Sequence, residues 1–176
     1  MRALSQRELV LAIYPLSRGF AFTAFESPLS PVDWGIKTIR GDRKNARSLE
    51  AVKRLIEQLQ PSALVLESTA DPRYRRGDRV RRLQSLVANH AKGQALEVCT
   101  FTRNEIRECF KATGAATRYE IAQVIASQIH AFSHRLPPPR KPWKSEDSRM
   151  GLFNAAALVL TFYCQTGPIV GQPGTR

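Results

Sequence analysis

The stretch VLAIYPLSRGFAFTAFES, residues 10–27, predicts two β-strands joined by a tight turn. Residues 9–14 form a continuous apolar run of the length expected for a strand buried on both faces. Gly19 opens the segment FAFTAFE, whose aromatic residues are typical of a strand that pairs back on the first. Residues 32–39 alternate apolar and polar side chains and predict a third strand. The three strands together predict an antiparallel meander.

Helices and strands alternate along the next part of the chain. Apolar residues at helical spacing predict helices over residues 46–59 and 78–91. A short apolar segment follows each of them, at 62–68 and at 95–101, and predicts a strand. Because strands that alternate with helices are joined by crossovers, this alternation predicts parallel pairing.

Three further helices are expected after the last strand. Thr102 with Glu105, and Thr117 with Glu120, have the spacing of a capping box, in which each side chain satisfies a free backbone N–H at a helix start. Ser145 is predicted to cap a last helix. The expected order is β-β-β-α-β-α-β-α-α-α, an α/β fold with a mixed five-stranded sheet.

Composition limits the class of protein and of partner. A chain of 176 residues with 43% hydrophobic residues is long enough to bury a core, and residues 1–166 are predicted to form one domain. The Gly- and Pro-rich residues 167–176 are predicted to be a disordered tail. Lys and Arg outnumber Asp and Glu by 27 to 15, a formal net charge of +12. Such a positive field favours polyanions, so nucleic acid is the leading class of partner.

Cysteine usage and the N-terminal segment bear on location. Cys99, Cys109 and Cys164 have no CxxC spacing, which favours free thiols in a reducing compartment. Glu8 and Pro15 interrupt the N-terminal segment, so neither a signal peptide nor a membrane span is predicted. The expected location is cytoplasmic, without a membrane partner.

The order of segments resembles that of the RuvC-like Holliday-junction resolvases, a family of the ribonuclease H-like superfamily, over residues 8–163. The matching pieces are LAIYPLSRGFAFTAFE, LVLES, TRNEIRECFKATGAATRYEIAQVIA and SEDSRMGLFNAAALVLTFY. The resemblance implies a nuclease fold that acts on DNA, so DNA is favoured over RNA as the partner.

The resemblance also implies a pair of Mg²⁺ ions, held by carboxylates from the first strand, the fourth strand and the final helix. Mg²⁺ requires oxygen ligands, and two ions that share carboxylates activate water and stabilise the leaving oxygen. Glu67, at the end of the segment ALVLE, matches the fourth-strand ligand. The alternative is that Glu67 is a strand-end carboxylate that only faces solvent.

Three positions depart from the acidic pattern of that family. Tyr14 stands where the family's first-strand Asp would bridge both ions, and a phenol with a pKa of about 10 is neutral at pH 7. Asn154 and Gly151 stand where the final helix would carry acidic residues. An amide can offer an oxygen ligand but no charge. The resemblance therefore implies a degenerate active site.

Asp147 has two interpretations. It lies seven residues before Asn154, which would place both on one face of the predicted last helix, so Asp147 is a weak candidate metal ligand beside Glu67. Alternatively, Asp147 and Glu146 only stabilise the positive end of the helix dipole.

A basic surface is predicted from the segment DPRYRRGDRVRR, residues 71–82. Arginines at these positions can form bidentate contacts with phosphates, and Tyr74 is predicted to stack on an unpaired base. The alternative is a solvated basic face. The candidate arginines are Arg73, Arg75, Arg76, Arg79, Arg81 and Arg82.

A second basic segment, RLPPPRKPWK, places Trp143 among cations just before the last helix. It is either a loop that contacts DNA or a linker that Trp143 packs against the core. Its candidate contacts are Arg135, Arg140, Lys141 and Lys144.

Three functions remain open from the sequence. The first is a pseudo-nuclease that binds branched or duplex DNA, as a homodimer or as a subunit of a larger DNA-processing complex. The second is an active, Mg²⁺-dependent, structure-selective endonuclease that uses Glu67, Asp147 and Asn154 with Ser17 as a substitute ligand. The third is a basic scaffold that binds RNA or an acidic protein.

Overall fold

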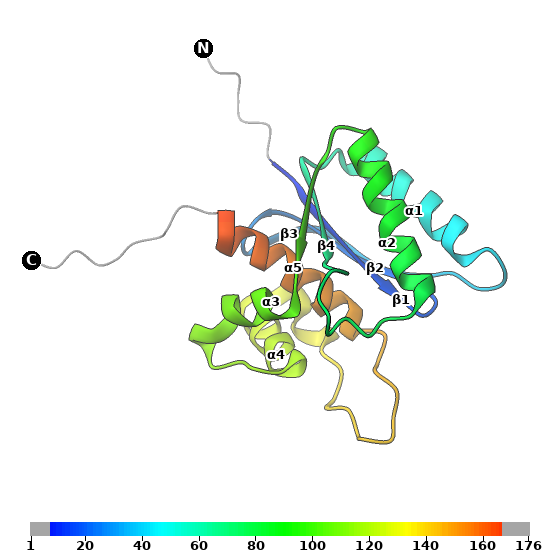
Figure 1. Ribbon diagram of the computed structural model, residues 1–176. Coiled ribbons are helices and arrows are strands. Elements are labelled where there is room, and N and C mark those ends of the chain that lie inside the picture. The colour runs from blue at the N-terminus through cyan, green and yellow to red at the C-terminus, as the bar shows by residue number, and fades with distance from the viewer. Residues whose placement is uncertain (1–7, 167–176) are drawn as a thin grey trace, which may run out of the picture.

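Three antiparallel strands form one half of a mixed sheet in the computed structural model, which describes residues 8–166 (Figure 1). They are β1 (Val10–Leu16), β2 (Gly19–Ser27) and β3 (Ser30–Thr38). Gly19 has a φ of 109°, and a Cβ there would lie 1.8 Å from the carbonyl oxygen of Lys37, so only glycine fits this turn. The predicted meander is confirmed. The predicted disordered tail, residues 167–176, lies outside the described residues.

The other half of the sheet is parallel to β1. β4 (Ala63–Glu67) pairs with β1, and β5 (Glu97–Phe101) pairs with β4, which gives the strand order β3-β2-β1-β4-β5. The crossovers are α1 (Lys44–Leu59) and α2 (Asp78–Gly93). The predicted α/β class, the five-stranded mixed sheet and the order of elements are all confirmed.

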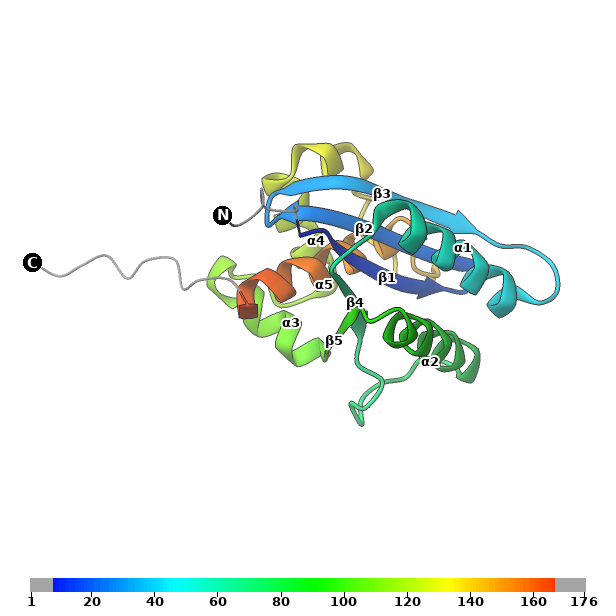
Figure 2. The ribbon, with the colours of Figure 1, turned by 90° about the horizontal axis from the view of Figure 1, so that it is seen from above.

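Side chains of β1 alternate between two cores, as the period of two along a strand requires. Leu11 and Ile13 pack in the core under α1 and α2. Val10, Ala12 and Tyr14 pack in the core on the opposite face of the sheet. Figures 1 and 2 show α1 and α2 on one side of the sheet and the three later helices on the other.

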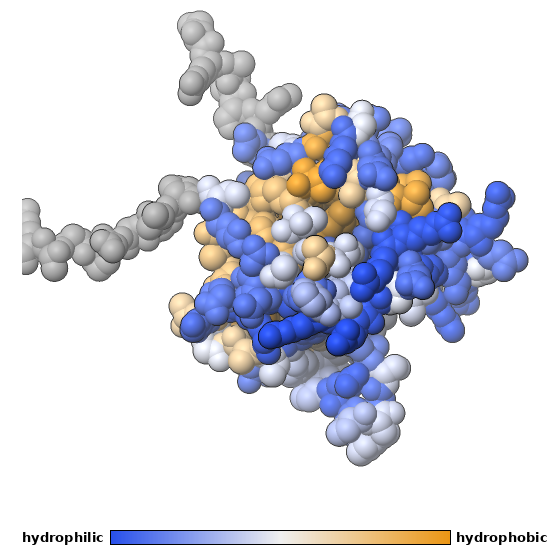
Figure 3. Space-filling model, viewed as in Figure 1, coloured by the Kyte–Doolittle hydropathy of each residue, from blue (hydrophilic) through white to orange (hydrophobic). Residues whose placement is uncertain are grey.

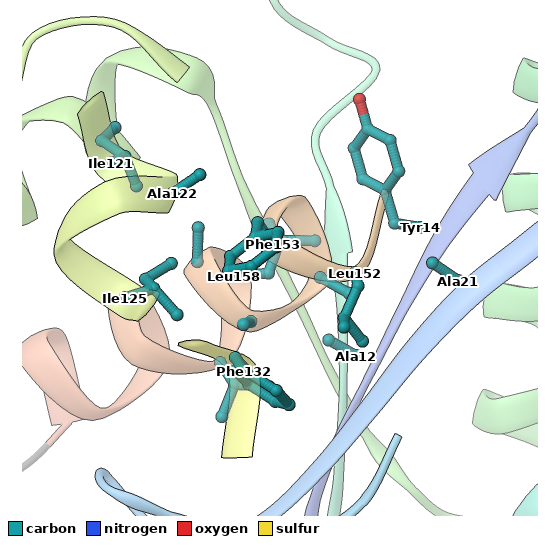
Figure 4. Close-up of a cluster of buried hydrophobic side chains, with 14 of the residues drawn as sticks. Ala12, Tyr14, Ala21, Ile121, Ala122, Ile125, Phe132, Leu152, Phe153 and Leu158 are labelled. Atoms are coloured by element: carbon teal, nitrogen blue, oxygen red, sulfur yellow. The ribbon is translucent and has the colours of Figure 1, made fainter. Parts of the chain in front are cut away.

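The three later helices are α3 (Arg103–Phe110), α4 (Arg118–Gln128) and α5 (Met150–Thr166). Both predicted capping boxes are present at the starts of α3 and α4. Short 3₁₀ turns, η1 (Lys111–Thr113) and η2 (His130–Arg135), follow these two helices. α5 is buried along most of its length between the sheet and α4, and Figure 4 shows its Phe153 and Leu158 among side chains of α4 and η2.

The last helix begins later than predicted. Ser145 does not cap it, and residues 145–149 precede the first helical residue, Met150. The Asp147 carboxylate accepts a hydrogen bond from the backbone N–H of Arg149 at 2.9 Å, so the chain forms a turn there. Local side-chain hydrogen bonding thus competes with helix formation. Asp147 therefore does not share a helix face with Asn154, and that prediction is wrong.

The structure bears on two expectations about location, the absence of a membrane span and the state of the cysteines. Within residues 8–166, no helix is both long enough and apolar enough to span a bilayer. Cys99, Cys109 and Cys164 are free thiols, of which the first two are half-buried and the third is exposed, and the reducing compartment remains a prediction.

Candidate nucleic-acid interface at the ends of β1 and β4

Tyr14 and Glu67 lie side by side at the carboxyl ends of two parallel strands. Ala12 pairs with Val65, and the same register continued by two residues places Tyr14 beside Glu67. Both side chains are buried, with 4% and 5% of their surface exposed. In Figure 4 the Tyr14 hydroxyl points away from the apolar cluster that contains Leu152 and Phe153. The sheet therefore brings a phenol and a carboxylate together where the resemblance places metal ligands.

The side chain of Arg76 enters this strand end. Its guanidinium carbon lies 4.5 Å from the centre of the Tyr14 ring, and Nη1 lies 4.0 Å from Oε2 of Glu67. Nη2 donates a hydrogen bond to the carbonyl of Pro15 at the end of β1. Arg76 thus stacks on the phenol, pairs with the carboxylate and binds the strand backbone. A fixed protein cation stands beside the carboxylate.

Glu67 is surrounded by cations yet is poorly solvated. Nε of Arg103, the first residue of α3, lies 3.7 Å from its Oε1, while its Oε2 has no hydrogen-bond partner. Burial raises the pKa of Glu67 above 4.5, although Arg118 and Arg76 act in the opposite direction. The desolvation of the carboxylate therefore outweighs the attraction of its neighbours.

The phenol of Tyr14 does not supply the missing charge. Burial raises its pKa above 10.0, and the adjacent Glu67 raises it further, because both favour the neutral form. A neutral phenol at this position cannot bridge two cations as a carboxylate does.

The two positions of α5 where the resemblance implies acidic residues are closed or neutral. Asn154 points into the same space, and its Nδ2 is buried without a hydrogen-bond partner. At Gly151, a Cβ would lie 2.7 Å from Cδ2 of Leu16 and 3.2 Å from Cβ of Ala21. α5 therefore approaches β1 and β2 so closely that an acidic side chain at Gly151 requires Leu16 to move.

Asp147 and Glu146 are engaged by arginines. The Asp147 carboxylate binds the Arg149 guanidinium through both oxygens, at 3.0 and 2.7 Å. These hydrogen bonds hold the pKa of Asp147 below its ordinary value. Glu146 lies 3.5 Å from Nη1 of Arg118, the first residue of α4. Both acids lie just before the first turn of α5, and their interaction with the helix dipole remains a prediction.

A cleft of about 1100 Å³ joins these groups to the surface. Tyr14, Glu67, Asn154 and Asp147 all line it. Part of its wall is apolar, from side chains of α3, α4 and α5. The cationic side chains that line it are Arg103, Arg107, Arg118, Arg140, Lys141 and Lys144. The cleft is therefore a basic opening over a nearly neutral floor.

Several solved structures with a similar architecture are of Holliday junction resolvases. RuvC of T. thermophilus, in complex with a Holliday junction substrate, is 15% identical, with a TM-score of 0.62 over 91% of this chain and 96% of that chain. The yeast mitochondrial Holliday junction resolvase is 13% identical, with a TM-score of 0.58 over 94% of this chain and 84% of that chain. The fowlpox virus Holliday junction resolvase is 11% identical, with a TM-score of 0.52 over 88% and 96%.

This chain has the RuvC-like fold. No protein-family model and no curated protein matches the sequence, so the likeness is one of architecture. The predicted RuvC-like fold is confirmed. With identities of 11–17%, the likeness carries the arrangement of elements and not the role of any residue.

The donor set of this RuvC-like fold does not fit a pair of Mg²⁺ ions. Among residues 8–166, Glu67 is the one buried carboxylate, and Arg76 already faces it. Within residues 8–166, no group of three or more His, Cys, Asp or Glu side chains is placed to hold a metal ion. Ser17, the proposed substitute ligand, is exposed in the turn after β1 and is not among the residues that line the cleft.

Part of the basic segment after β4 is directed into the protein. Tyr74 is 7% exposed, its hydroxyl donates to Oε1 of Gln84 at 2.6 Å, and burial raises its pKa to about 12. The prediction that Tyr74 stacks on a base is therefore wrong. Arg76 is held at the strand ends, as described above. Arg79 donates to the carbonyl of Ser17 at 3.0 Å, and Arg81 to that of Tyr74 at 3.0 Å.

Four of the six arginines of that segment lie on the surface. Arg73, Arg75, Arg81 and Arg82 are exposed, and contact with nucleic acid remains a prediction for them. Gln84 of α2 holds Tyr74 in place by accepting the hydrogen bond from its hydroxyl. Gln84 in turn donates to the backbone carbonyl of Glu67 at 3.1 Å.

Arg103 and Arg118 are cleft residues that the sequence analysis did not assign. Each is the first residue of a helix, directly after the capping threonine of a capping box. Because α3 follows β5 by one residue, Arg103 begins its helix next to the end of β4. The signal available in the sequence was an arginine directly after the N-cap of a helix that follows a strand.

Proposed function

We propose that this protein binds branched or duplex DNA through its RuvC-like fold and has lost most or all metal-dependent nuclease activity. The observation that carries the proposal is the position of Arg76, whose guanidinium contacts both Tyr14 and Glu67. A metal pair needs several negative charges at this point. Here one carboxylate faces a cation of the protein itself.

The cleft supports DNA as the ligand. Its lining includes six arginine and lysine side chains, and the chain carries a net charge of +12. Cations on the wall of a cleft contact phosphates and release counterions, which supplies affinity without cleavage. A structure with the same fold is solved with a Holliday junction, which makes branched DNA the first ligand to test.

An active endonuclease is the second candidate, and the contacts of its ligands count against it. Asp147 is bound by Arg149 through both oxygens, and Ser17 lies outside the cleft. Such a site would need Arg76 and Asp147 to rearrange when Mg²⁺ binds. A third candidate, a scaffold for RNA or an acidic protein, predicts a preference for those ligands over DNA. A homodimer or a larger DNA-processing complex remains a proposal for the assembled form.

The test compares binding and cleavage with one set of labelled substrates. The purified protein is mixed with a four-way junction, duplex DNA, single-stranded DNA and duplex RNA, in Mg²⁺, Mn²⁺ or EDTA. We expect DNA binding of equal strength in EDTA and in Mg²⁺, without cleavage. Cleavage in Mg²⁺ that Glu67→Gln abolishes would contradict the proposal and favour the endonuclease.

A revertant sharpens this test. Tyr14→Asp with Asn154→Asp restores two acidic positions but leaves Arg76 beside Glu67. Adding Arg76→Ser removes the competing cation. We expect metal-dependent cleavage by the triple variant to be faster than cleavage by the double variant. The matched control combines the same two acidic substitutions with Arg82→Ser, an exposed arginine of the same segment.

A further inference from the structure

The segment between the helical layer and α5 projects from the body of the protein. We call residues 138–149 the arm. It extends as a loop below α4 and α5 in Figure 1, and the space-filling view in Figure 3 shows the same protrusion. Arg140, Lys141 and Lys144 of the arm line the cleft. The arm therefore forms part of the rim of the basic opening.

The arm is anchored at both ends and closed at its tip. Before it, the hydroxyl of Tyr119 donates to the carbonyl of Pro137 at 2.9 Å, and near its end Glu146 pairs with Arg118 at 3.5 Å. At the tip, the N–H of Lys144 donates to the carbonyl of Lys141 at 3.0 Å. This bond closes a tight turn with Pro142 and Trp143 at its two central positions. Because proline fixes its own φ, the backbone of the turn has less freedom to lose when a ligand binds to Trp143.

Trp143 is far more exposed than an indole without a ligand should be. Its exposed fraction is 77%, and it is one of three large hydrophobic side chains that are exposed within residues 8–166. The other tryptophan, Trp34, packs edge-on against Phe132, with ring centres 5.3 Å apart. The interpretation that Trp143 packs its linker against the core is therefore wrong. An indole placed at the tip of an anchored turn is available to a ligand.

The surroundings of Trp143 match the chemistry of a nucleotide. Nζ of Lys141 lies 5.6 Å from the centre of the indole ring, and Arg140 and Lys144 flank the turn. One flat aromatic ring among cations complements a base whose neighbouring phosphates carry negative charge. A protein partner would favour a contiguous apolar patch, whereas the residues next to Trp143 are proline and lysine.

We propose that Trp143 stacks on an unpaired base at the mouth of the cleft, while Arg140, Lys141 and Lys144 hold the flanking phosphates. This inference rests on the proposed function and narrows its ligand to DNA with unstacked bases, as in a single strand or the centre of a junction. In a continuous duplex every base is already stacked, so Trp143 has no partner there. The arm then contributes only its charges.

The first test compares Trp143→Ala with the unmodified protein on single-stranded, four-way and duplex DNA of equal length at one salt concentration. We expect the Kd for single-stranded and four-way DNA to rise by about tenfold, the scale of one lost base–aromatic stack, and the Kd for duplex to change by less than about twofold. Trp143→Phe should restore most of the affinity. Leu29→Ala is the control, because Leu29 is another exposed apolar side chain, at 58%, outside the cleft.

The second test uses the emission of the two tryptophans. Saturating single-stranded DNA should quench the unmodified protein, whereas Trp143→Phe, which retains Trp34 alone, should show little quenching. Equal weakening of all three DNAs by Trp143→Ala, or no weakening of any, would overturn the inference while leaving the proposed function in place. An emission shift with anionic vesicles, together with unchanged DNA affinity, would overturn it in favour of a membrane. If the unmodified protein binds none of the DNAs, the proposed function itself fails.

Discussion

Two basic segments of this protein look alike in sequence and differ in orientation. Residues 71–82, after β4, and the arm at 138–149 each carry one aromatic residue among several cations. In the first segment the aromatic residue, Tyr74, is 7% exposed, whereas Trp143 in the arm is 77% exposed. A cluster of cations around an aromatic ring therefore does not by itself identify a binding surface. The ring is available to a ligand only if no neighbouring element of the protein buries it.

The difference extends to the charges of the two segments. Arg76 and Arg79 are partly buried and donate to backbone carbonyls at the end of β1 and in the turn after it, and Arg76 also faces Glu67. These two arginines stabilise the end of β1. The cations of the arm are all exposed. We infer that Arg76 and Arg79 maintain the floor of the cleft and that the cations of the arm contact the ligand.

Removal of the Arg76 side chain should give the largest effect on the free energy of unfolding. Arg76→Ala leaves Glu67 buried beside Tyr14 with Arg103 as its remaining ion-pair partner, and removes the side-chain donor to the Pro15 carbonyl. Breaking a buried pair from one side costs about 3 kcal/mol of unfolding free energy. Urea denaturation at pH 7 measures it. Arg82→Ala, an exposed arginine of the same segment, should change stability by less than about 0.5 kcal/mol.

A double variant separates the ion pair from simple loss of packing. If Glu67 is the reason for the penalty, Glu67→Gln should recover a large part of the stability lost in Arg76→Ala. Additive losses in the two single variants and the double variant would mean that Arg76 acts through its contacts with Tyr14 and Pro15 alone. The ion pair with Glu67 would then not explain why Arg76 differs from the exposed cations of the arm.

The tight approach of α5 should make Gly151→Asp the next most disruptive change. Its Cβ would lie 2.7 Å from Cδ2 of Leu16 and 3.2 Å from Cβ of Ala21. Overpacking at such a site costs about 2 kcal/mol, seen as a lower Tm. Leu16→Ala added to Gly151→Asp should make the pair less destabilised than the sum of the single variants. A fully tolerated Gly151→Asp would show that this helix position is still open to an acidic ligand.

The order of elements could be predicted from sequence because its signals are local. The run at 9–14, the turn at Gly19 and the two capping threonines each specify their element within a few residues. The start of α5 could not be predicted in this way. Helix propensity gives no sign that Asp147 would bind the backbone N–H and guanidinium of Arg149 and form a turn instead.

The sequence could predict which residues end the strands at the site, but it could not predict their side-chain contacts. Tyr14 and Glu67 follow from the ends of two buried strands that pair in parallel. That Arg76 reaches back over Tyr14 depends on the path of a loop, and loop paths carry no periodic signal. Exposure is equally nonlocal, because whether Tyr74 or Trp143 is buried depends on packing between distant segments.

Charge removal from the arm should weaken DNA binding by a smaller, salt-dependent amount. A triple variant, Arg140→Ala with Lys141→Ala and Lys144→Ala, should reduce the steepness of log K against log salt by about 2 to 3, since each lost phosphate contact removes about 0.9. Fluorescence anisotropy over a range of salt measures the slope. The control is Arg54→Ala with Lys92→Ala, exposed cations of α1 and α2, the helices on the other face of the sheet. If the control reduces the slope equally, the arm is not the preferred contact.

The smallest expected effect is the pH dependence that Glu67 gives to stability. Burial raises its native pKa above 4.5, so the native state binds more protons than the unfolded state once pH exceeds the unfolded value. The Glu67 contribution is thus most favourable at low pH and is lost as pH rises through the native pKa. Glu67→Gln lacks this titration, so the variant should gain stability relative to the unmodified protein between pH 4 and 8. Urea denaturation across that range measures the difference, in which all other titrations cancel. A trend of the opposite sign would mean that Arg76 and Arg103 outweigh desolvation, so that the inward cations stabilise an ionised carboxylate.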